Sequence, residues 1–177
     1  MLFRSLDKKV ASLLNEQLNK EFYSAYLYLD FANWFEDAGL TGFAHWYEVQ
    51  AKEELDHALA IRTYLCDSGC RVRLDAVARP DKVFDEAAAV LEAGLAHERY
   101  VSASINEVYA VAAEAKDFKT MQFLDAFVKE QGEEEKNAED LIKKMKLFGS
   151  DPRSLYLLDK DLAARVYTPF VAGDAAN

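Results

Sequence analysis

Six polar side chains that could bind a metal ion fall near the middle of four long helical stretches, where the interior of a helical protein should be apolar. Within this set, Glu54 and His57 are spaced i, i+3, so they share one helix face and can bind the same ion. A buried carboxylate costs several kcal/mol unless a positive charge meets it. The pattern therefore predicts a metal site with the candidate ligands Glu21, Glu54, His57, Glu98, Gln131 and Glu134.

The types of these ligands indicate which metal the site would bind and how many ions it would hold. Carboxylate and amide oxygens with one imidazole suit Fe(II), Mn(II) or Zn(II) better than copper, which prefers soft ligands. Four ionised glutamates carry a charge of −4, which two divalent cations would neutralise, so charge balance favours a dinuclear centre. Tyr28 lies on the same helical stripe as Glu21. It is either a core tyrosine or a group that binds a ligand carboxylate or donates an electron.

Three more glutamates lie next to the candidate ligands in the sequence, so their side chains point about 100° away from them on the helix. They are Glu53, Glu130 and Glu133. Two interpretations remain open from the residues alone. These side chains form a third, looser metal site, or they are charged residues on an exposed face.

Four long helices must position the ligands, and capping residues and glycines predict where each helix begins and ends. The predicted spans are about 5–37, 41–68, 85–115 and 117–148, and the residues expected at their N-termini are Ser5, Thr41, Asp85 and Asp117. Pro152 belongs to the first turn of a short fifth helix, over about 152–165. The tail, 166–177, has no pattern that predicts structure.

The connection between the second and third helices indicates the topology. Residues 69–84 can reach roughly 50 Å when extended, which is enough to traverse a whole helix, whereas the other two connections are tight turns. We therefore predict an all-α four-helix bundle, with one long crossover between helices two and three and a short fifth C-terminal helix. The midpoints of the four long helices fall at the candidate ligands, so the six side chains should converge.

Composition and charge exclude several classes of function. The 177 residues suit a single domain over 1–177, and the net charge of −10 argues against nucleic acid or an anionic membrane surface as a partner. No apolar run is long enough for a membrane span, and the beginning of the sequence lacks the features of a secretory signal. The only cysteines, Cys66 and Cys70, are expected to be reduced thiols, so we predict a cytoplasmic protein.

Around the candidate ligands the chain resembles the ferritins, most closely the prokaryotic non-haem type. The most specific segments are NEQLNKEFYSAYLYL around Glu21, KEELDHA around Glu54 and His57, and KEQGEEEK around Gln131 and Glu134. The resemblance covers about residues 5–165. It implies that the protein is a ferroxidase that oxidises Fe(II) with O2 or peroxide. It also implies that ferric oxyhydroxide is stored inside a hollow homo-oligomeric cage of 24 subunits.

The resemblance also implies a role for each candidate. Glu21, Glu54 and His57 match the first iron site, with Glu54 bridging, while Glu98 and Glu134 match the second, with Gln131 beside it. Tyr28 matches the tyrosine next to the centre. Glu53, Glu130 and Glu133 match a third iron site of bacterial members. The fifth helix would line the fourfold axis of the cage, and its apolar stripe would suit packing between subunits; the stripe consists of Leu155, Leu158 and Leu162.

Departures from related families narrow the prediction. Bacterioferritins have a second Glu-x-x-His motif and bind haem through a methionine, but here Asn137 stands where that histidine would follow Glu134. Haem is therefore not expected. Three other classes remain as alternatives: a rubrerythrin-type di-iron oxygenase or peroxidase, a mini-ferritin, and a storage subunit without a competent ferroxidase. The complete ligand set favours the catalytic ferritin.

Overall fold

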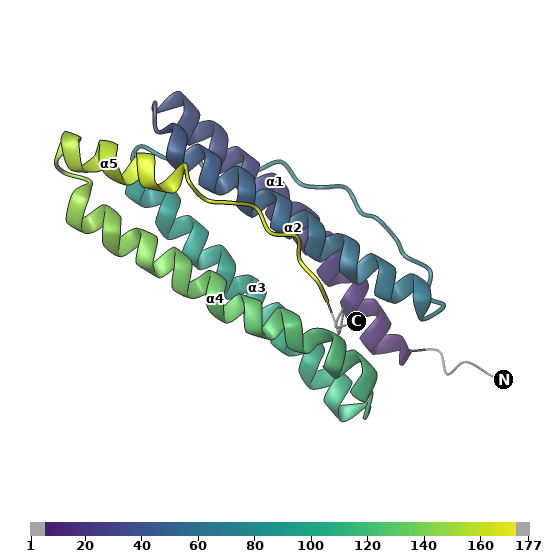
Figure 1. Cartoon of the computed structure of the whole chain (residues 1–177). Coiled ribbons are helices and arrows are strands. Elements are labelled where there is room, and N and C mark those ends of the chain that lie inside the picture. The colour runs from purple at the N-terminus through teal and green to yellow at the C-terminus, as the bar shows by residue number, and fades with distance from the viewer. Residues whose placement is uncertain (1–5, 173–177) are drawn as a thin grey trace.

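The computed structural model describes residues 6–172, and Figure 1 shows two antiparallel helical hairpins packed side by side. A short fifth helix packs against the second and fourth helices at one end of the bundle. The helices are α1 (Lys8–Asp37), α2 (Thr41–Asp67), α3 (Ala87–Glu114), α4 (Phe118–Phe148) and α5 (Pro152–Leu162). The predicted all-α four-helix bundle with one long crossover and a short fifth helix is confirmed.

Most helix ends follow from capping residues in the sequence. Asp7 caps α1, because its carboxylate accepts hydrogen bonds from two backbone amides of the first turn. The predicted cap, Ser5, lies outside the described residues. Asp117 caps α4 and Pro152 begins α5, both as predicted. The third helix begins at Ala87, two residues later than predicted, because the residue before it has an extended backbone.

The first turn of α2 is capped by a distant side chain. Thr41 is the first helical residue and not the cap, and Leu40 at the cap position makes no side-chain hydrogen bond. Instead, Asp159 of α5 accepts hydrogen bonds through Oδ1 from the backbone amides of Gly42 (2.8 Å) and Phe43 (3.0 Å). A Cβ on Gly42 would lie 1.7 Å from the carbonyl oxygen of Asp159. The glycine therefore permits the close approach of α5.

The turns of the two hairpins use different residues for the same backbone conformation. Gly39 between α1 and α2 has a φ of 76°, which glycine adopts without steric cost. Lys116 between α3 and α4 has a φ of 54°, a left-handed conformation that is unfavourable for a residue with a side chain. The second hairpin thus has the more strained turn.

The core consists of two apolar clusters separated by a polar band. One cluster lies near the α1–α2 turn and includes Phe31, Phe35 and Phe43, and the other lies near the opposite end and includes Leu14 and Ile61. All six predicted ligands are buried in the band between them. This is the predicted pattern of apolar ends and a polar middle. Among the described residues, no helix is both long and apolar enough to cross a membrane.

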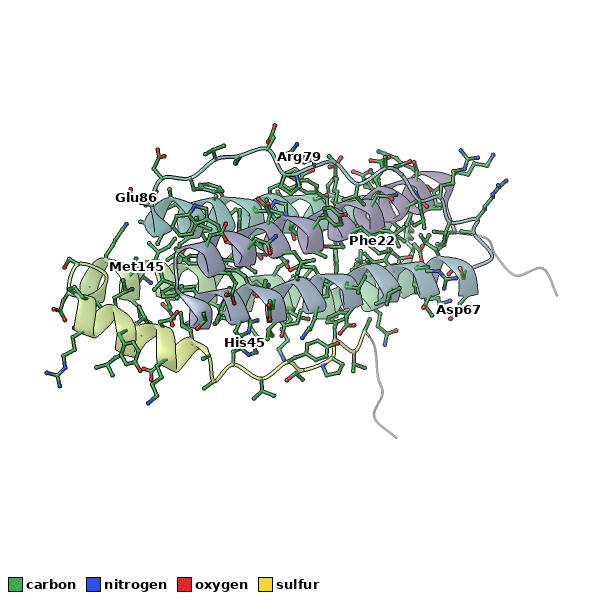
Figure 2. The ribbon with its side chains drawn as sticks, turned by 90° about the horizontal axis from the view of Figure 1, so that it is seen from above. Phe22, His45, Asp67, Arg79, Glu86 and Met145 are labelled. Carbon is green, nitrogen blue, oxygen red and sulfur yellow. The ribbon has the colours of Figure 1, made fainter. Side chains whose placement is uncertain are left out.

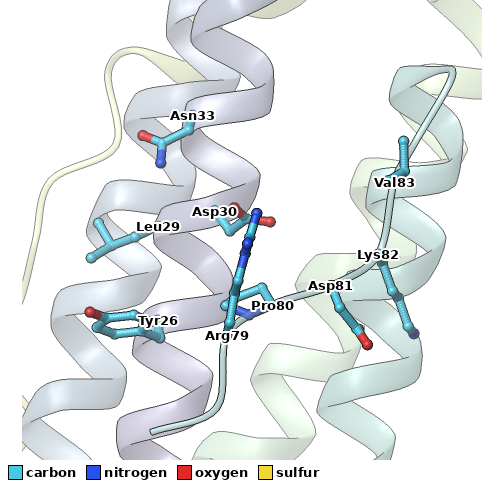
Figure 3. A pocket seen from close by; sticks show the side chains of 9 residues that line it. All are labelled: Tyr26, Leu29, Asp30, Asn33, Arg79, Pro80, Asp81, Lys82 and Val83. Atoms are coloured by element: carbon cyan, nitrogen blue, oxygen red, sulfur yellow. The ribbon is translucent and has the colours of Figure 1, made fainter.

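The crossover between α2 and α3 runs extended along α1 (Figures 1 and 2). Asn15 and Asn19 of α1 each donate a side-chain hydrogen bond to the backbone carbonyl of Arg73. Their side-chain Oδ1 atoms accept from the backbone amides of Arg73 and Asp75, respectively. Further along, the crossover and α1 enclose a surface hollow of about 680 Å³, into which Tyr26 faces (Figure 3). The long connection is therefore ordered by side chains of α1.

The segment after α5 returns along α2 and α4 (Figure 1), although its sequence gave no structural prediction. The fifth helix ends at Leu162, earlier than the predicted residue 165, and the chain then leaves the helix. Asp56 of α2 accepts hydrogen bonds from the Tyr167 hydroxyl and from the backbone amide of Phe170 (3.1 Å). We call residues 165–172 the C-terminal strap.

The apolar stripe of α5 is used within the chain. Leu158 and Leu162 are buried in the core cluster near the α1–α2 turn, and Leu155 is partly buried against the same cluster. The prediction that this stripe serves packing between subunits is therefore wrong. The large hydrophobic side chains that α5 leaves exposed are Tyr156 and Leu157.

Candidate metal centre

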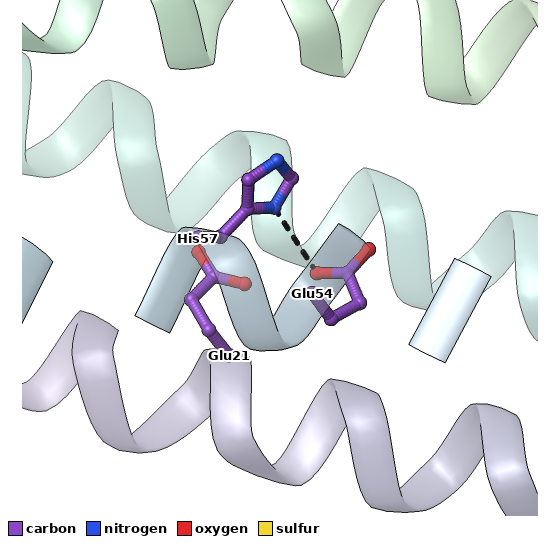
Figure 4. Close-up of side chains that lie close together, drawn as sticks. All are labelled: Glu21, Glu54 and His57. Atoms are coloured by element: carbon purple, nitrogen blue, oxygen red, sulfur yellow. Dashed lines mark hydrogen bonds and ion pairs between the residues drawn. The ribbon is translucent and has the colours of Figure 1, made fainter. Parts of the chain in front are cut away.

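The first hairpin brings three predicted ligands together. Glu54 and His57 lie one turn apart on α2, and Glu21 faces them from α1 (Figure 4). Each of the three offers one ligand atom, and these atoms all lie within 4.8 Å of one another. All three side chains are at least 99% buried. This arrangement can hold a cation between two carboxylates and an imidazole.

Two atoms of this group lack partners. Glu21 Oε2 and His57 Nε2 are buried and make no hydrogen bond within the described part of the chain. His57 Nδ1 lies 3.4 Å from Glu54 Oε2, and Nε2 lies 3.4 Å from Glu130 Oε2, at ion-pair distance. A buried polar atom without a partner costs roughly 1–3 kcal/mol. A divalent cation would satisfy the Glu21 oxygen, so the residues fit a metal ion.

The second hairpin supplies a carboxylate pair whose hydrogen bonds are satisfied. Glu98 of α3 accepts from the Tyr28 hydroxyl through Oε1 and from Gln131 Nε2 through Oε2, the latter at 3.0 Å. Glu134 of α4 accepts from Gln50 Nε2 at 2.8 Å. Tyr28, Gln50 and both glutamates border one small cavity. The predicted ligand Gln131 thus binds a neighbouring carboxylate through its amide nitrogen in this structure.

Gln50 connects the two halves and was missed as a site residue. Its Nε2 donates to Glu54 Oε1 (3.2 Å) as well as to Glu134. Gln50 stands one turn before Glu54 in the sequence, but the sequence does not show which groups the side-chain amide of an inward-facing glutamine would bind. One amide group therefore holds a carboxylate of each half.

A second chain of hydrogen bonds orients Glu21 and was also missed. Gln17 Nε2 donates to Glu21 Oε1 at 2.7 Å, and Ser104 Oγ donates to Gln17 Oε1 at 2.6 Å. Lys20 Nζ in turn donates to Ser104 Oγ at 2.6 Å. Such supporting groups fix the direction of a ligand and its affinity for a metal.

Burial and mutual repulsion perturb the acids of the band. Burial, followed by the charge of Glu54, raises the pKa of Glu21 to about 8 and that of Glu134 to about 7. The same two causes raise the pKa of Glu98 well above its usual value. Burial alone would raise the pKa of Glu54 too, but the hydrogen bond and charge of His57 outweigh it and lower that pKa. In the metal-free protein, protons therefore neutralise buried carboxylates of the band, at positions where bound cations would also be favourable.

His57 responds in the opposite way to its surroundings. Burial alone would lower the pKa of the imidazole, but the carboxylates of Glu130 and Glu54 outweigh burial and raise the pKa well above its usual value. Metal binding requires a neutral imidazole nitrogen, so an ion at this position must displace a proton.

Comparison with known proteins identifies the family of the chain. The model of a family described as a ferritin-like domain matches residues 11–148. The chain belongs to the ferritin family. It is 38% identical over 155 residues to a bacterial non-heme ferritin from Campylobacter jejuni, covering 88% of this chain and 93% of that protein. It is 36% identical over 157 residues to a probable bacterial non-heme ferritin-like protein from Haemophilus influenzae, covering 89% and 95%.

Solved ferritin structures share the fold. An open pore ferritin from the hyperthermophilic archaeon Archaeoglobus fulgidus has a TM-score of 0.89 and 42% identity, covering 92% of this chain and 99% of that one. A closed form of that ferritin, engineered by site-directed mutagenesis, has a TM-score of 0.90 and 42% identity, covering 93% and 100%. The predicted resemblance to the ferritins is confirmed.

The three additional glutamates border a hollow of about 400 Å³ between α2, α4 and the C-terminal strap. Their environments differ, and only one matches the alternative of an exposed acidic face. Glu133 is exposed and Glu130 is partly buried, whereas Glu53 is only 8% exposed and is paired with Arg165. Burial raises the pKa of Glu53, and the charge of Arg165 partly offsets it. The strap thus contributes a cation beside the predicted third site of this ferritin-family chain.

Proposed function

We propose that the protein stores iron and that it oxidises Fe(II) at a dinuclear centre within each chain. The observation that carries this proposal is the buried group of Glu21, Glu54 and His57, in which Glu21 Oε2 has no hydrogen-bond partner in the described part of the chain. Membership of the ferritin family and the non-heme ferritin relatives support iron as the metal. Ferric oxyhydroxide would be the stored product.

In this proposal each half of the band binds one ion. Glu21 and His57 hold the first ion, Glu98 and Glu134 hold the second, and Glu54 lies between them. Gln131 and Tyr28 hold Glu98 in place through their hydrogen bonds. Two Fe(II) ions supply two electrons, the number that reduces O2 to peroxide or peroxide to water. The acids and His57, whose pKa values are raised, release their protons as the ions bind.

The assembly and location of the protein also belong to this proposal. We infer a hollow homo-oligomeric cage, with 24 subunits as the expected number, in the cytoplasm. Large apolar side chains remain exposed on the outer side of α1 and on the crossover, among them Leu29 (47%) and Leu74 (66%). Such side chains suit burial between subunits. Neither nucleic acid nor membrane is expected as a partner, because the net charge is −10.

Aerobic addition of Fe(II) to the metal-free protein tests the proposal. Ferric absorbance and particle size are followed together. We expect fast oxidation by the wild type and a strong loss of rate in the double variant Glu54→Ala, His57→Ala. The matched control is Glu48→Ala, which removes an exposed carboxylate from the same helix and should oxidise Fe(II) like the wild type. Slow oxidation by the wild type, or equal rates in the double variant, would contradict the assignment. A small particle would contradict the cage alone.

A further inference from the structure

Arg165 is fixed beside the candidate metal centre by contacts to α2. Its Nη1 donates to the carbonyl oxygen of Trp46 (3.1 Å) and to Gln50 Oε1 (2.9 Å), and its Nη2 donates to Glu53 Oε2. The guanidinium also lies 4.2 Å from the centroid of the Trp46 ring. With 17% of its side chain exposed, Arg165 is held in one place.

The backbone around Arg165 is anchored as well. Its carbonyl oxygen lies 2.9 Å from His45 Nε2 of α2. Two residues further along the C-terminal strap also contact α2: the Tyr167 hydroxyl donates to Asp56, and the ring centroid of Phe170 lies 4.6 Å from that of His57. The position of the arginine is therefore set by the fold and not by Glu53 alone.

The hollow beside Arg165 has an excess of negative charge. Glu53, Glu130, Glu133 and Glu134 border it, while its lining includes two cationic side chains, Arg165 and Lys129. Lys129 is 81% exposed and lies 4.0 Å from Glu133, so its charge is well screened. Glu130 reaches from this hollow to the buried His57 nitrogen, at 3.4 Å. A third divalent ion here would be next to the dinuclear centre.

We propose that Arg165 acts as a built-in cation of this hollow, bound to Glu53 when no third metal ion is present and displaced from Glu53 when one binds. Arg165 therefore sets the affinity of the third ion. That ion must compete with a tethered charge for the most buried of the three carboxylates, so it is bound more weakly than the two ions of the centre and exchanges readily. This inference deepens the proposed function and rests on it.

The contact to Gln50 gives the displacement a second consequence. The amide of Gln50 receives a hydrogen bond from Arg165 through its oxygen and donates through its nitrogen to Glu54 and Glu134. An unbroken path of hydrogen bonds thus leads from the hollow to both halves of the centre. Binding of an ion in the hollow should therefore affect the ligands of the dinuclear centre.

Zn²⁺ binding to the metal-free, assembled protein tests the inference without any redox chemistry. The number and affinity of bound ions are measured by calorimetric titration and by metal analysis after dialysis. In Arg165→Gln we expect the third ion to bind about tenfold more tightly or better, because a unit charge no longer repels a divalent ion a few ångströms away. Arg165→Lys keeps the charge and should stay within about threefold of the wild type. Adding Glu53→Gln to Arg165→Gln should remove the gain.

The outcomes separate this inference from the proposed function. Fewer than two ions bound by the wild type would contradict the dinuclear centre, whereas the inference depends only on the change caused by Arg165→Gln. No tightening in that variant, or equal tightening in Arg165→Lys, would overturn it. Should Arg165→Gln fail to assemble, the variant Trp34→Phe can be used instead, because it keeps Arg165 and leaves Trp46 as the only tryptophan. The fluorescence of Trp46 then reports on the guanidinium that lies over its ring. A change of emission at the third Zn²⁺ equivalent supports displacement, and constant emission at that step refutes it.

Discussion

The two hairpins contribute equally many predicted ligands to the buried band, but they hold them in different states. On the α1–α2 side, Glu21 and His57 each keep a buried atom without a hydrogen-bond partner in the described chain. On the α3–α4 side, Glu98 and Glu134 accept hydrogen bonds from neighbouring side chains. An ion entering the first half can bind Glu21 Oε2 without displacing a hydrogen bond. An ion entering the second half must compete with existing hydrogen bonds.

This difference indicates an order of binding. The first half gains the most from a cation, because its unpaired polar atoms are costly in the metal-free protein. The second half is closer to a stable state without metal. We therefore expect the first ion to bind more tightly, at Glu21, Glu54 and His57, and the second to follow.

Removing a ligand from each half in turn should have the largest effect and tests the order in which the two halves bind ions. In Glu21→Ala the tight ion should be lost, with an affinity decrease of about a thousandfold, since breaking a buried charge pair costs roughly 3–5 kcal/mol. In Glu98→Ala the tight ion should remain and the weaker one should be lost. Calorimetric Zn²⁺ titration of both variants gives the result. Glu16→Ala, an exposed change on α1, is the control; equal losses in the two ligand variants would contradict the order.

The stability of the metal-free protein should depend on pH in a direction set by the band. Glu21 and Glu134 have folded-state pKa values of about 8 and about 7, both raised by burial, so the native state binds more protons than the unfolded state. The raised pKa of His57 acts in the same direction. Stability is therefore highest below about pH 4.5, as far as these groups are concerned, and falls as the pH rises to 8, by up to about 1.4 kcal/mol for each unit by which a pKa is raised.

Denaturant unfolding of the metal-free protein across this pH range measures the effect. Glu21→Gln should flatten the profile more than Glu134→Gln, because the pKa of Glu21 is raised further. Saturating Zn²⁺ should flatten it as well, since cations then replace the protons. A metal-free protein that gains stability between pH 5 and 8 would be evidence against a buried acidic band.

How the sequence anticipates this band can be traced to particular residues. The ligands stand on apolar stripes at the midpoints of four helices of similar length, so the burial of Glu21, Glu54, Glu98 and Glu134 follows from periodicity and topology together. The residues that support them do not follow in this way. Gln50 and Gln17 occupy inward positions, but only the packed structure shows which carboxylates they bind.

The C-terminal part of the chain is where prediction from the sequence fails. Arg165 binds Gln50 and Glu53, more than a hundred residues away in the sequence, from the predicted end of the fifth helix, which in the structure has already ended at Leu162. Likewise, the apolar stripe of α5 is evident from the sequence, but whether its own bundle or another subunit covers it is a matter of tertiary packing. Asp159, which caps α2 from α5, shows the same limit.

Gln50 offers a smaller test, because within residues 6–172 it is the side chain that donates to a carboxylate of each half. Replacing it with leucine removes the donors to Glu54 and Glu134 and should cost about 1–2 kcal/mol, shared between the affinities of the two ions. We expect the second ion to weaken about fivefold or more and the first to weaken less. Zn²⁺ titration against wild type checks this, and unchanged affinities for both ions would show that the bridge is incidental.

The smallest expected effect concerns the turns of the hairpins and not their ligands. Lys116→Gly relieves a left-handed backbone conformation in the α3–α4 turn and should raise the stability by about 0.5 kcal/mol. Gly39→Ala introduces the same strain into the α1–α2 turn and should lower it by about 1 kcal/mol. Thermal unfolding measures both. Neither variant should alter Zn²⁺ binding. A change in affinity would mean that the backbone conformation of a turn influences the metal ligands in the middle of its hairpin.

Locating the metal directly tests whether each chain holds two ions and whether the tighter one lies on the α1–α2 side. Crystals of the protein loaded with Fe(II) in the absence of oxygen, measured at the iron absorption edge, would show where the ions lie. We expect two anomalous peaks in each chain, the stronger among Glu21, Glu54 and His57 and the weaker among Glu54, Glu98 and Glu134. Peaks confined to the surface, or a stronger peak on the α3–α4 side, would contradict it.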